Sequence, residues 1–233
     1  DRGPFYSSMH KINFSTDNVI CKLATDSIFL GKAGVQVAGT KESTVVFESI
    51  EYFREREFTK MQNIASYNPI SIIKRTAESE GRKIEASYLA KSFDPNFTVD
   101  NIKGLLFQLV EEGFIDYDSD QEMVYVRDKI EHFTDSNAEK KDYDYIKVTS
   151  KSLETNALLT TSDSKIEMNG VENVEFSPNQ RVGLLPRNNE LVMTYNRNMD
   201  FDGRAFAGYS QFEGKDFSFI YDKNQIPYEG IWS

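Results

Sequence analysis

The hydrophobic periodicity of this chain changes twice along its length, and that change constrains the fold more than any other feature. In residues 1–67 and 136–233, hydrophobic residues alternate with polar ones over short runs, which is the pattern of half-buried strands. Residues 68–135 carry hydrophobic residues at helical spacing instead. The three regions therefore predict an α+β protein that is rich in strands and carries an inserted helical module near its middle.

The strand-like runs of the first region follow one another at short, even intervals. They centre on Ile12 and Phe14, on Val19, Cys21 and Leu23, on Ile28 and Leu30, on Val35 and Val37, and on Val45 and Phe47. Such spacing is typical of a sandwich, a meander or the successive coils of a β-solenoid. Residues 49–65 then approach helical spacing, which predicts a helix or an ordered connection. We expect the strands before Pro69 and after Tyr143 to belong to one sheet system that the module interrupts.

The middle region predicts three helices followed by a β-hairpin. Asn68 is a good helix cap, Pro69 suits the first helical turn, and Gly81 is typical of a helix end. Thr98 is expected to cap the third helix. The expected elements are helices over 69–80, 85–93 and 99–112 and strands over 114–117 and 123–126.

This order of elements resembles the winged-helix fold from Pro69 to Arg127. The resemblance rests on the stretch from Leu105 to Ile115, in which a leucine-rich third helix runs into a Glu-Glu-Gly-Phe-Ile corner. It is a resemblance of fold, and it implies three helices with a β-hairpin wing. In members that bind DNA, the third helix enters the major groove and basic residues contact phosphate.

The distribution of charge argues against DNA as the partner of this module. The chain has a net charge of −10, and residues 68–135, with 8 basic and 14 acidic side chains, carry −6 of it. The expected third helix offers Lys103 as its only basic residue, against Asp100, Glu111 and Glu112. Because cations supply most of the affinity for phosphate, this pattern favours a module that packs or contacts protein.

The hairpin tip is the first candidate for a metal site. Asp116, Asp118 and Asp120 have the spacing that opens a calcium-binding loop. That loop needs Gly at its sixth position and Glu at its twelfth, where this chain has Gln121 and Arg127. The three carboxylates therefore indicate a solvated hairpin tip.

Residues for nucleophilic catalysis or zinc binding are few. His10 and His132 are the only histidines, and neither lies in a Ser or Cys nucleophile pattern. Cys21, the single cysteine, is expected to be a small core residue, and His132 is expected on the surface. The glycine-lysine pairs Gly31-Lys32 and Gly214-Lys215 lack the glycine spacing of a phosphate-binding loop. We expect no catalytic residue, no cofactor and no metal.

The last region resembles strand-rich stretches of very long Bacteroidetes proteins. The resemblance is carried by Asn169–Glu172, by Leu185-Pro186, by Met199–Arg204 and by Gly214–Phe219. It implies stacked coils and brings no known activity with it. Turns or corners are expected at Asn169-Gly170, Pro178-Asn179, Asn188-Asn189, Asp202-Gly203 and Glu213-Gly214.

Aromatic residues crowd the end of the chain. They are Tyr195, Phe201, Phe206, Tyr209, Phe212, Phe217, Phe219, Tyr221, Tyr228 and Trp232. Their alternation favours a narrow β core, and the alternative is an exposed platform for glycan or protein partners.

Three regions are therefore expected, 1–67, 68–135 and 136–233, in a non-catalytic structural or protein-interaction segment of a larger scaffold. Its partner would be another protein or a neighbouring segment of the same long chain. The alternatives are a nucleic-acid-binding regulator that uses the winged helix, and a carbohydrate-binding module. No apolar run approaches the roughly 20 residues of a membrane span. The compartment is open, with the cell envelope or secretion favoured.

Overall fold

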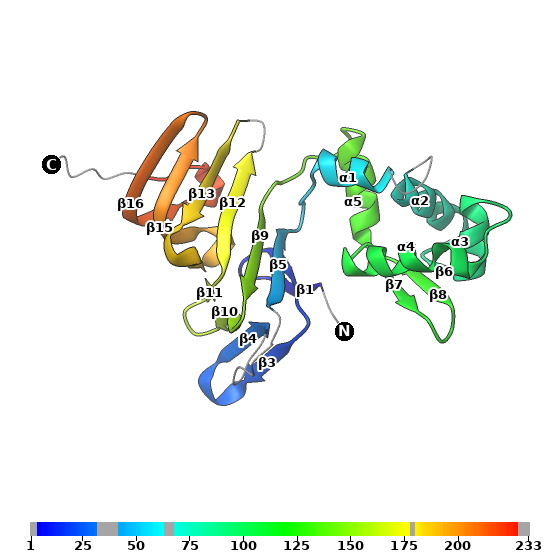
Figure 1. Cartoon of the computed structure of the whole chain (residues 1–233), viewed down its shortest axis with the longest axis horizontal. Coiled ribbons are helices and arrows are strands. Elements are labelled where there is room, and N and C mark those ends of the chain that lie inside the picture. Colours follow the sequence, from blue (N-terminus) through cyan, green and yellow to red (C-terminus); the bar gives the residue numbers. More distant parts are fainter. Residues whose placement is uncertain (1–3, 32–41, 63–67, 178–179, 228–233) are drawn as a thin grey trace. The chain divides into compact units, whose positions relative to one another are not determined.

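A computed structural model describes residues 4–31, 42–62, 68–177 and 180–227 (Figure 1). The chain divides into two compact units. The β unit takes the chain up to Tyr52 and from Tyr145 onward, and the inserted unit is Phe53–Asp144. The inserted unit is thus longer at both ends than the region 68–135. The expected strand at Val35 and Val37 and the expected turn at Pro178-Asn179 lie outside the described residues.

The β unit is a single large antiparallel sheet. Its strands are β1 (Phe5–Ser7), β2 (Ile12–Ser15), β3 (Val19–Lys22), β4 (Ser27–Gly31), β5 (Ser43–Ser49), β9 (Lys147–Ser152), β10 (Thr155–Thr160), β11 (Lys165–Met168), β12 (Val171–Ser177), β13 (Val182–Pro186), β14 (Leu191–Met193), β15 (Met199–Ala207) and β16 (Ser210–Phe219). Short 3-10 turns η1 (Leu23–Thr25), η2 (Arg187–Asn189), η3 (Tyr195–Arg197) and η4 (Tyr221–Lys223) connect some of them.

Strands from before and after the inserted unit belong to the same sheet. Among the described residues the order is β1-β2-β5-β9-β12-β13-β15-β14-β11-β10-β4-β3, with β16 on β15. β5 pairs with β9 from Ser43↔Ser152 to Glu48↔Lys147, so strands from before and after the insertion are direct neighbours. The sheet system that the sequence analysis expects on both sides of the module is therefore continuous.

The stacked coils of a solenoid are not formed by the described strands. Every pairing in this sheet is antiparallel, whereas the coils of a β-solenoid pair in parallel. The sheet instead curls on itself, because Leu30 of β4 and Phe47 of β5, which stand far apart in the strand order, bury into one core. The large curled antiparallel sheet agrees with the prediction of a strand-rich α+β protein.

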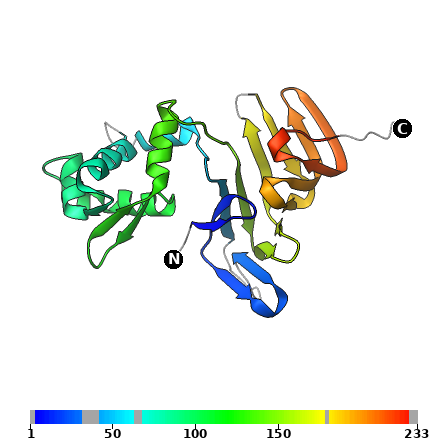
Figure 2. The ribbon, with the colours of Figure 1, turned by 180° about the vertical axis from the view of Figure 1, so that it is seen from behind.

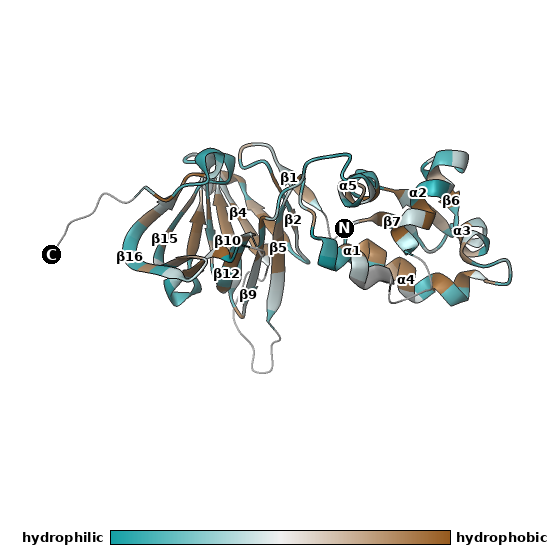
Figure 3. Cartoon of the chain, turned by 90° about the horizontal axis from the view of Figure 1, so that it is seen from above, coloured by the Kyte–Doolittle hydropathy of each residue, from teal (hydrophilic) through white to brown (hydrophobic). Residues whose placement is uncertain are grey.

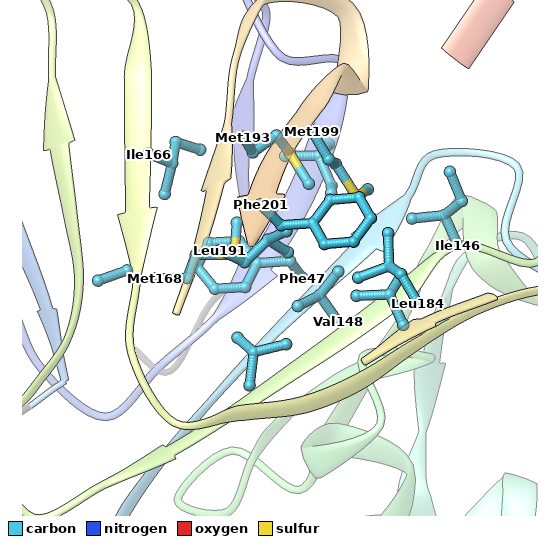
Figure 4. Close-up of a cluster of buried hydrophobic side chains, with 14 of the residues drawn as sticks. Phe47, Ile146, Val148, Ile166, Met168, Leu184, Leu191, Met193, Met199 and Phe201 are labelled. Atoms are coloured by element: carbon cyan, nitrogen blue, oxygen red, sulfur yellow. The ribbon is translucent and has the colours of Figure 1, made fainter. Parts of the chain in front are cut away.

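The core of the β unit fills the concave side of this curled sheet. Figure 4 shows the ring of Phe201 among Met199, Leu184, Val148 and Phe47, contributed by β15, β13, β9 and β5. All five side chains are at least nine-tenths buried. Alternation of buried and exposed residues along β15 is the physical basis of the period-two pattern in the sequence.

Two expected turns lie inside strands. Asp202-Gly203 is part of β15 and Glu213-Gly214 is part of β16, where Gly203 pairs with Gly214 beside a register shift. A Cβ on Gly203, which has a φ of +139°, would lie 2.3 Å from the carbonyl oxygen of Leu185. Close approach of a neighbouring strand at a bulge, rather than a turn, therefore requires this glycine.

Among its described residues, the inserted unit contains five helices and a three-stranded sheet. Its elements are α1 (Glu55–Gln62), α2 (Pro69–Glu80), β6 (Lys83–Glu85), α3 (Ala86–Phe93), α4 (Val99–Glu111), β7 (Ile115–Asp118), β8 (Met123–Val126) and α5 (Asp128–Asn137), with the sheet order β6-β8-β7. The Asn68 side chain accepts a hydrogen bond from the Ile70 N–H at 2.9 Å, and Gly81, with a φ of +88°, ends α2. The three expected helices and the hairpin are present; β6 and α5 were not expected.

The inserted unit has a hydrophobic core of its own. Ile73 of α2, Leu89 of α3 and Leu106 of α4 are fully buried. The rings of Phe114 and Phe133 meet edge to face at 4.9 Å, which attaches α5 to this core. Across the described parts of both units, the structure contains no helix with the length and hydrophobicity to span a membrane.

Candidate protein-interaction surface

Helix α4 is held so that one of its faces stays open to solvent. The N–H of Thr98 donates to the Asn101 side chain at 2.8 Å, which fixes the first turn. Ile102, Leu106 and Leu109 point into the core and are at most 2% exposed. In Figure 3, α4 carries both hydrophobic and hydrophilic residues along its length.

An aromatic pair marks the open face of α4. Phe107 is 53% exposed, although it lies in the middle of the helix. Its ring contacts the ring of Tyr117 on β7, with centroids 6.1 Å apart and an interplanar angle of 78°. Exposed aromatic rings fixed by a neighbour are enriched where proteins bind proteins, because they bury a large area at a low entropy cost.

Three carboxylates lie close enough to Tyr117 to act on its hydroxyl. Burial, followed by the negative charges of Glu122, Asp100 and Asp118, raises the pKa of the Tyr117 hydroxyl. The hydroxyl therefore stays protonated at neutral pH and can donate a hydrogen bond. We call Asp100, Gly104, Phe107, Tyr117 and Glu122 the α4 surface.

Gly104 leaves a gap in the α4 surface. It lies between Asp100 and Phe107 at i+4 and i+7 spacing, so the three positions share one face of the helix. A Cβ at Gly104 would meet no atom within 4 Å. No neighbouring atom in the described chain therefore requires glycine at position 104. Glycine inside a helix nevertheless costs about 1 kcal/mol relative to alanine.

Basic side chains near the hairpin bind groups of the protein itself. Arg127 pairs with Asp116, its Nε lying 2.7 Å from Oδ2. Lys129 donates to the carbonyl oxygen of Glu112 at 2.8 Å and lies over the Phe114 ring. On α4, Lys103 is the single basic residue. The potential around the α4 surface is thus set mainly by carboxylates.

The hairpin tip has the geometry of a turn. The Asp118 side chain accepts hydrogen bonds from the backbone N–H groups of Asp120 and Gln121, both at 3.0 Å. Asp116 is engaged by Arg127. Within the described ranges, no three His, Cys, Asp or Glu side chains are grouped so that they could hold a metal ion.

Both histidines are buried. His10 is completely buried, and its Nε2 donates to the Ser164 carbonyl oxygen at 3.0 Å while its Nδ1 lies 2.8 Å from Ser7 Oγ. The expectation that His132 lies on the surface is wrong, since it is 8% exposed. Its position beside Glu131, after the expected hairpin, indicates a surface residue, but His132 belongs to α5, which buries it together with Ile130 and Phe133.

The expectation that Cys21 is a core residue is also wrong, because Cys21 is exposed. Cys21 lies on the same face as Val19 and opposite Ile28, both of which pack partly against the core. It is exposed because β3 is the last of the described strands in the order of the sheet, and burial decreases along it from Val19 to Lys22. Alternation in sequence identifies a strand but does not show where along the strand the core ends.

The aromatic residues near the end of the chain divide between core and surface. Phe201, Phe217 and Phe219 are buried in the β core, whereas Tyr195, Tyr209 and Phe212 are more than half exposed. Tyr228 and Trp232 lie outside the described residues. A packed core and an exposed aromatic group therefore both exist.

Phe107, Tyr117 and Gly104 are not among the residues that the sequence predicts to be functional. The available signal was that Phe107 falls outside the spacing of Ile102, Leu106 and Leu109, so it cannot share their buried face. Its contact with Tyr117 depends on the fold. Comparison of the chain with protein-family models, with curated proteins and with solved structures finds no match.

Proposed function

We propose that this chain is a non-catalytic protein-interaction segment of a scaffold, and that its inserted unit is a winged-helix module that binds protein through the α4 surface. The order α2-β6-α3-α4-β7-β8, with the sheet order β6-β8-β7, supports the winged-helix assignment. α4 would then be the helix that reads DNA in other members of this fold.

The observation that carries the proposal is the exposed Phe107–Tyr117 pair among carboxylates. A DNA-binding helix needs cations where α4 has Asp100 and Glu111. An apolar ring with a rim of negative charge fits a protein segment that combines hydrophobic and basic side chains. The partner would therefore be a basic, amphipathic segment, either of another protein or of the same long chain.

Fluorescence anisotropy of the full chain with three labelled probes tests this. The probes are a short peptide of alternating Lys and Leu, the same peptide with Glu in place of Lys, and a short mixed-sequence DNA duplex. We expect the Lys-Leu peptide alone to bind. Phe107→Ala, which removes an exposed ring and leaves no cavity, should weaken binding roughly tenfold.

Tyr209→Ala is the matched control. Tyr209 is 97% exposed and belongs to the β unit, so its removal deletes an exposed ring that is not part of the α4 surface. Binding of the Lys-Leu peptide should be unchanged. Tight, steeply salt-dependent binding of the duplex would instead favour the nucleic-acid alternative. Equal peptide binding by Phe107→Ala and the parent chain would contradict the α4 surface.

A further inference from the structure

A cavity of about 580 Å³ is lined entirely by residues of the β unit. It is lined by side chains from β12, β13, β15 and β16 and from the segment that follows η4. Figures 1 and 2 show β13, β15 and β16 side by side, with η4, in red, crossing one face of them. The volume falls in the range of about 300–1,000 Å³ that is usual for small-molecule sites.

The cavity arises from a change in side-chain size along β15. Met199 and Phe201, at one end of the strand, fill the core (Figure 4). Ala205 and Ala207, at the other end, line the cavity. Val182 of β13 is opposite Ala207 in the sheet and lines it too. Larger side chains here would add packing and remove a void that costs stability, so packing alone does not explain the two alanines.

Aromatic rings form the walls. Phe176 and Phe219 stack with centroids 4.1 Å apart and an interplanar angle of 15°. Phe212, which also lines the cavity, is 57% exposed. A phenylalanine that borders an open cavity leaves apolar area in contact with water, and an apolar ligand would cover that area.

Polar side chains are confined to two positions in the lining. Glu213 is paired with Arg187 at 3.1 Å, with 64% and 42% of their side chains exposed, and Asn224 is also exposed. These groups therefore stand where the cavity meets solvent. A sugar needs hydrogen bonds on several sides, which this lining does not provide, whereas a molecule with an apolar body and one polar end fits both parts.

We propose that this cavity binds a small apolar or amphiphilic molecule. Its ring system or acyl chain would lie over Ala205 and Ala207 among Phe176, Phe212 and Phe219, with its polar end near Glu213 and Asn224. The site is independent of the proposed protein contact, because all of its residues belong to the β unit.

Binding of phenylnaphthylamine to the full chain tests the proposal, since this uncharged aromatic dye brightens in apolar surroundings. Ala207→Trp should reduce its affinity roughly tenfold by filling the cavity. Ala207 is exposed, so the larger side chain can be accommodated without repacking the core. Ala24→Trp is the matched control, because Ala24 is an exposed residue of η1 in the same unit and does not line the cavity. It should bind as the parent does.

Phe212→Ala provides a second variant that deletes a wall instead of blocking the space, and it should also weaken binding. Circular dichroism melting checks that each variant is as folded as the parent, because loosely packed proteins bind such dyes nonspecifically. Decanol and naphthalene compete as the acyl and ring forms of the ligand, and displacement by either supports the site. No binding by the parent, equal binding by both Trp variants, or displacement only by a cello-oligosaccharide would overturn the proposal.

Discussion

His10 connects two distant turns of the β unit through a neutral imidazole. Donation from Nε2 to the Ser164 carbonyl leaves Nδ1 as the acceptor for the Ser7 hydroxyl. Burial lowers the pKa of His10 from its ordinary value of 6.5, and the hydrogen bond to Ser164 offsets only part of that effect. The unfolded chain therefore binds a proton more readily than the folded chain just below pH 6.5.

This residue gives the β unit a predictable pH dependence. The contribution of His10 to the free energy of unfolding of the β unit should be constant above the unfolded pKa. It should fall as the pH drops from 6.5 through the lower, folded pKa. In His10→Gln this component disappears, while the titrating carboxylates are the same in both proteins. Urea unfolding at several pH values measures it. A difference between parent and variant that stays constant down to pH 5 would contradict the assignment.

Single residues also show where sequence analysis stops. Asn156 is completely buried in β10, and its amide donates to the carbonyl oxygens of Ser43 and Ser150 at 2.9 and 3.1 Å. A Cβ on Gly31 would lie 1.9 Å from the side-chain oxygen of Asn156. The hydrophobic pattern of Ala157, Leu158 and Leu159 predicts the strand, but a polar contact between β5, β9 and β10 depends on which strands are neighbours.

At the scale of elements, local signals predicted the helices better than the long strands. Caps such as Asn68 act within one turn, so they can be read from adjacent residues. The sequence did not predict α5, because Ile130 and Phe133 are its only two hydrophobic residues. In addition, Arg127, at its N-cap, makes no side-chain cap hydrogen bond. β13 and β15 carry Gly183 and Gly203, which resemble turn residues until the neighbouring strand is known.

Two glycines of the inserted unit should respond to alanine in opposite ways. A Cβ would meet no atom within 4 Å at Gly104 or at Gly81. Gly104 is inside α4, so Gly104→Ala should raise the free energy of unfolding by about 1 kcal/mol. Gly81 has a φ of +88°, so Gly81→Ala should lower it by about as much.

Urea unfolding of the inserted unit measures both changes. The same Gly104→Ala protein should bind the Lys-Leu peptide more weakly, because the methyl group fills the gap beside Phe107. Greater stability with weaker binding separates an effect on the surface from an effect on folding. Unchanged peptide binding in a stabilised variant would show that the gap does not contribute to the contact.

At the scale of the whole molecule, the insertion begins and ends at hydrogen-bonded neighbours. The N–H of Phe53 donates to the carbonyl oxygen of Asp144 at 2.8 Å. In the β unit, Ser49 N–H donates to the Ile146 carbonyl oxygen at 3.0 Å, next to the β5–β9 pair. Chain ends that meet in this way allow a domain to be inserted into a strand connection without opening the sheet.

Each unit should therefore fold when it is produced without the other. Residues 53–144 should fold alone and bind the Lys-Leu peptide, because their core and the α4 surface lie within them. A chain in which an Asn-Gly turn joins Tyr52 to Tyr145 should keep the sheet and bind phenylnaphthylamine. Calorimetry of the full chain should then show two transitions that match the separate pieces. A single shared transition, with both pieces unfolded, would mean that the two cores depend on each other.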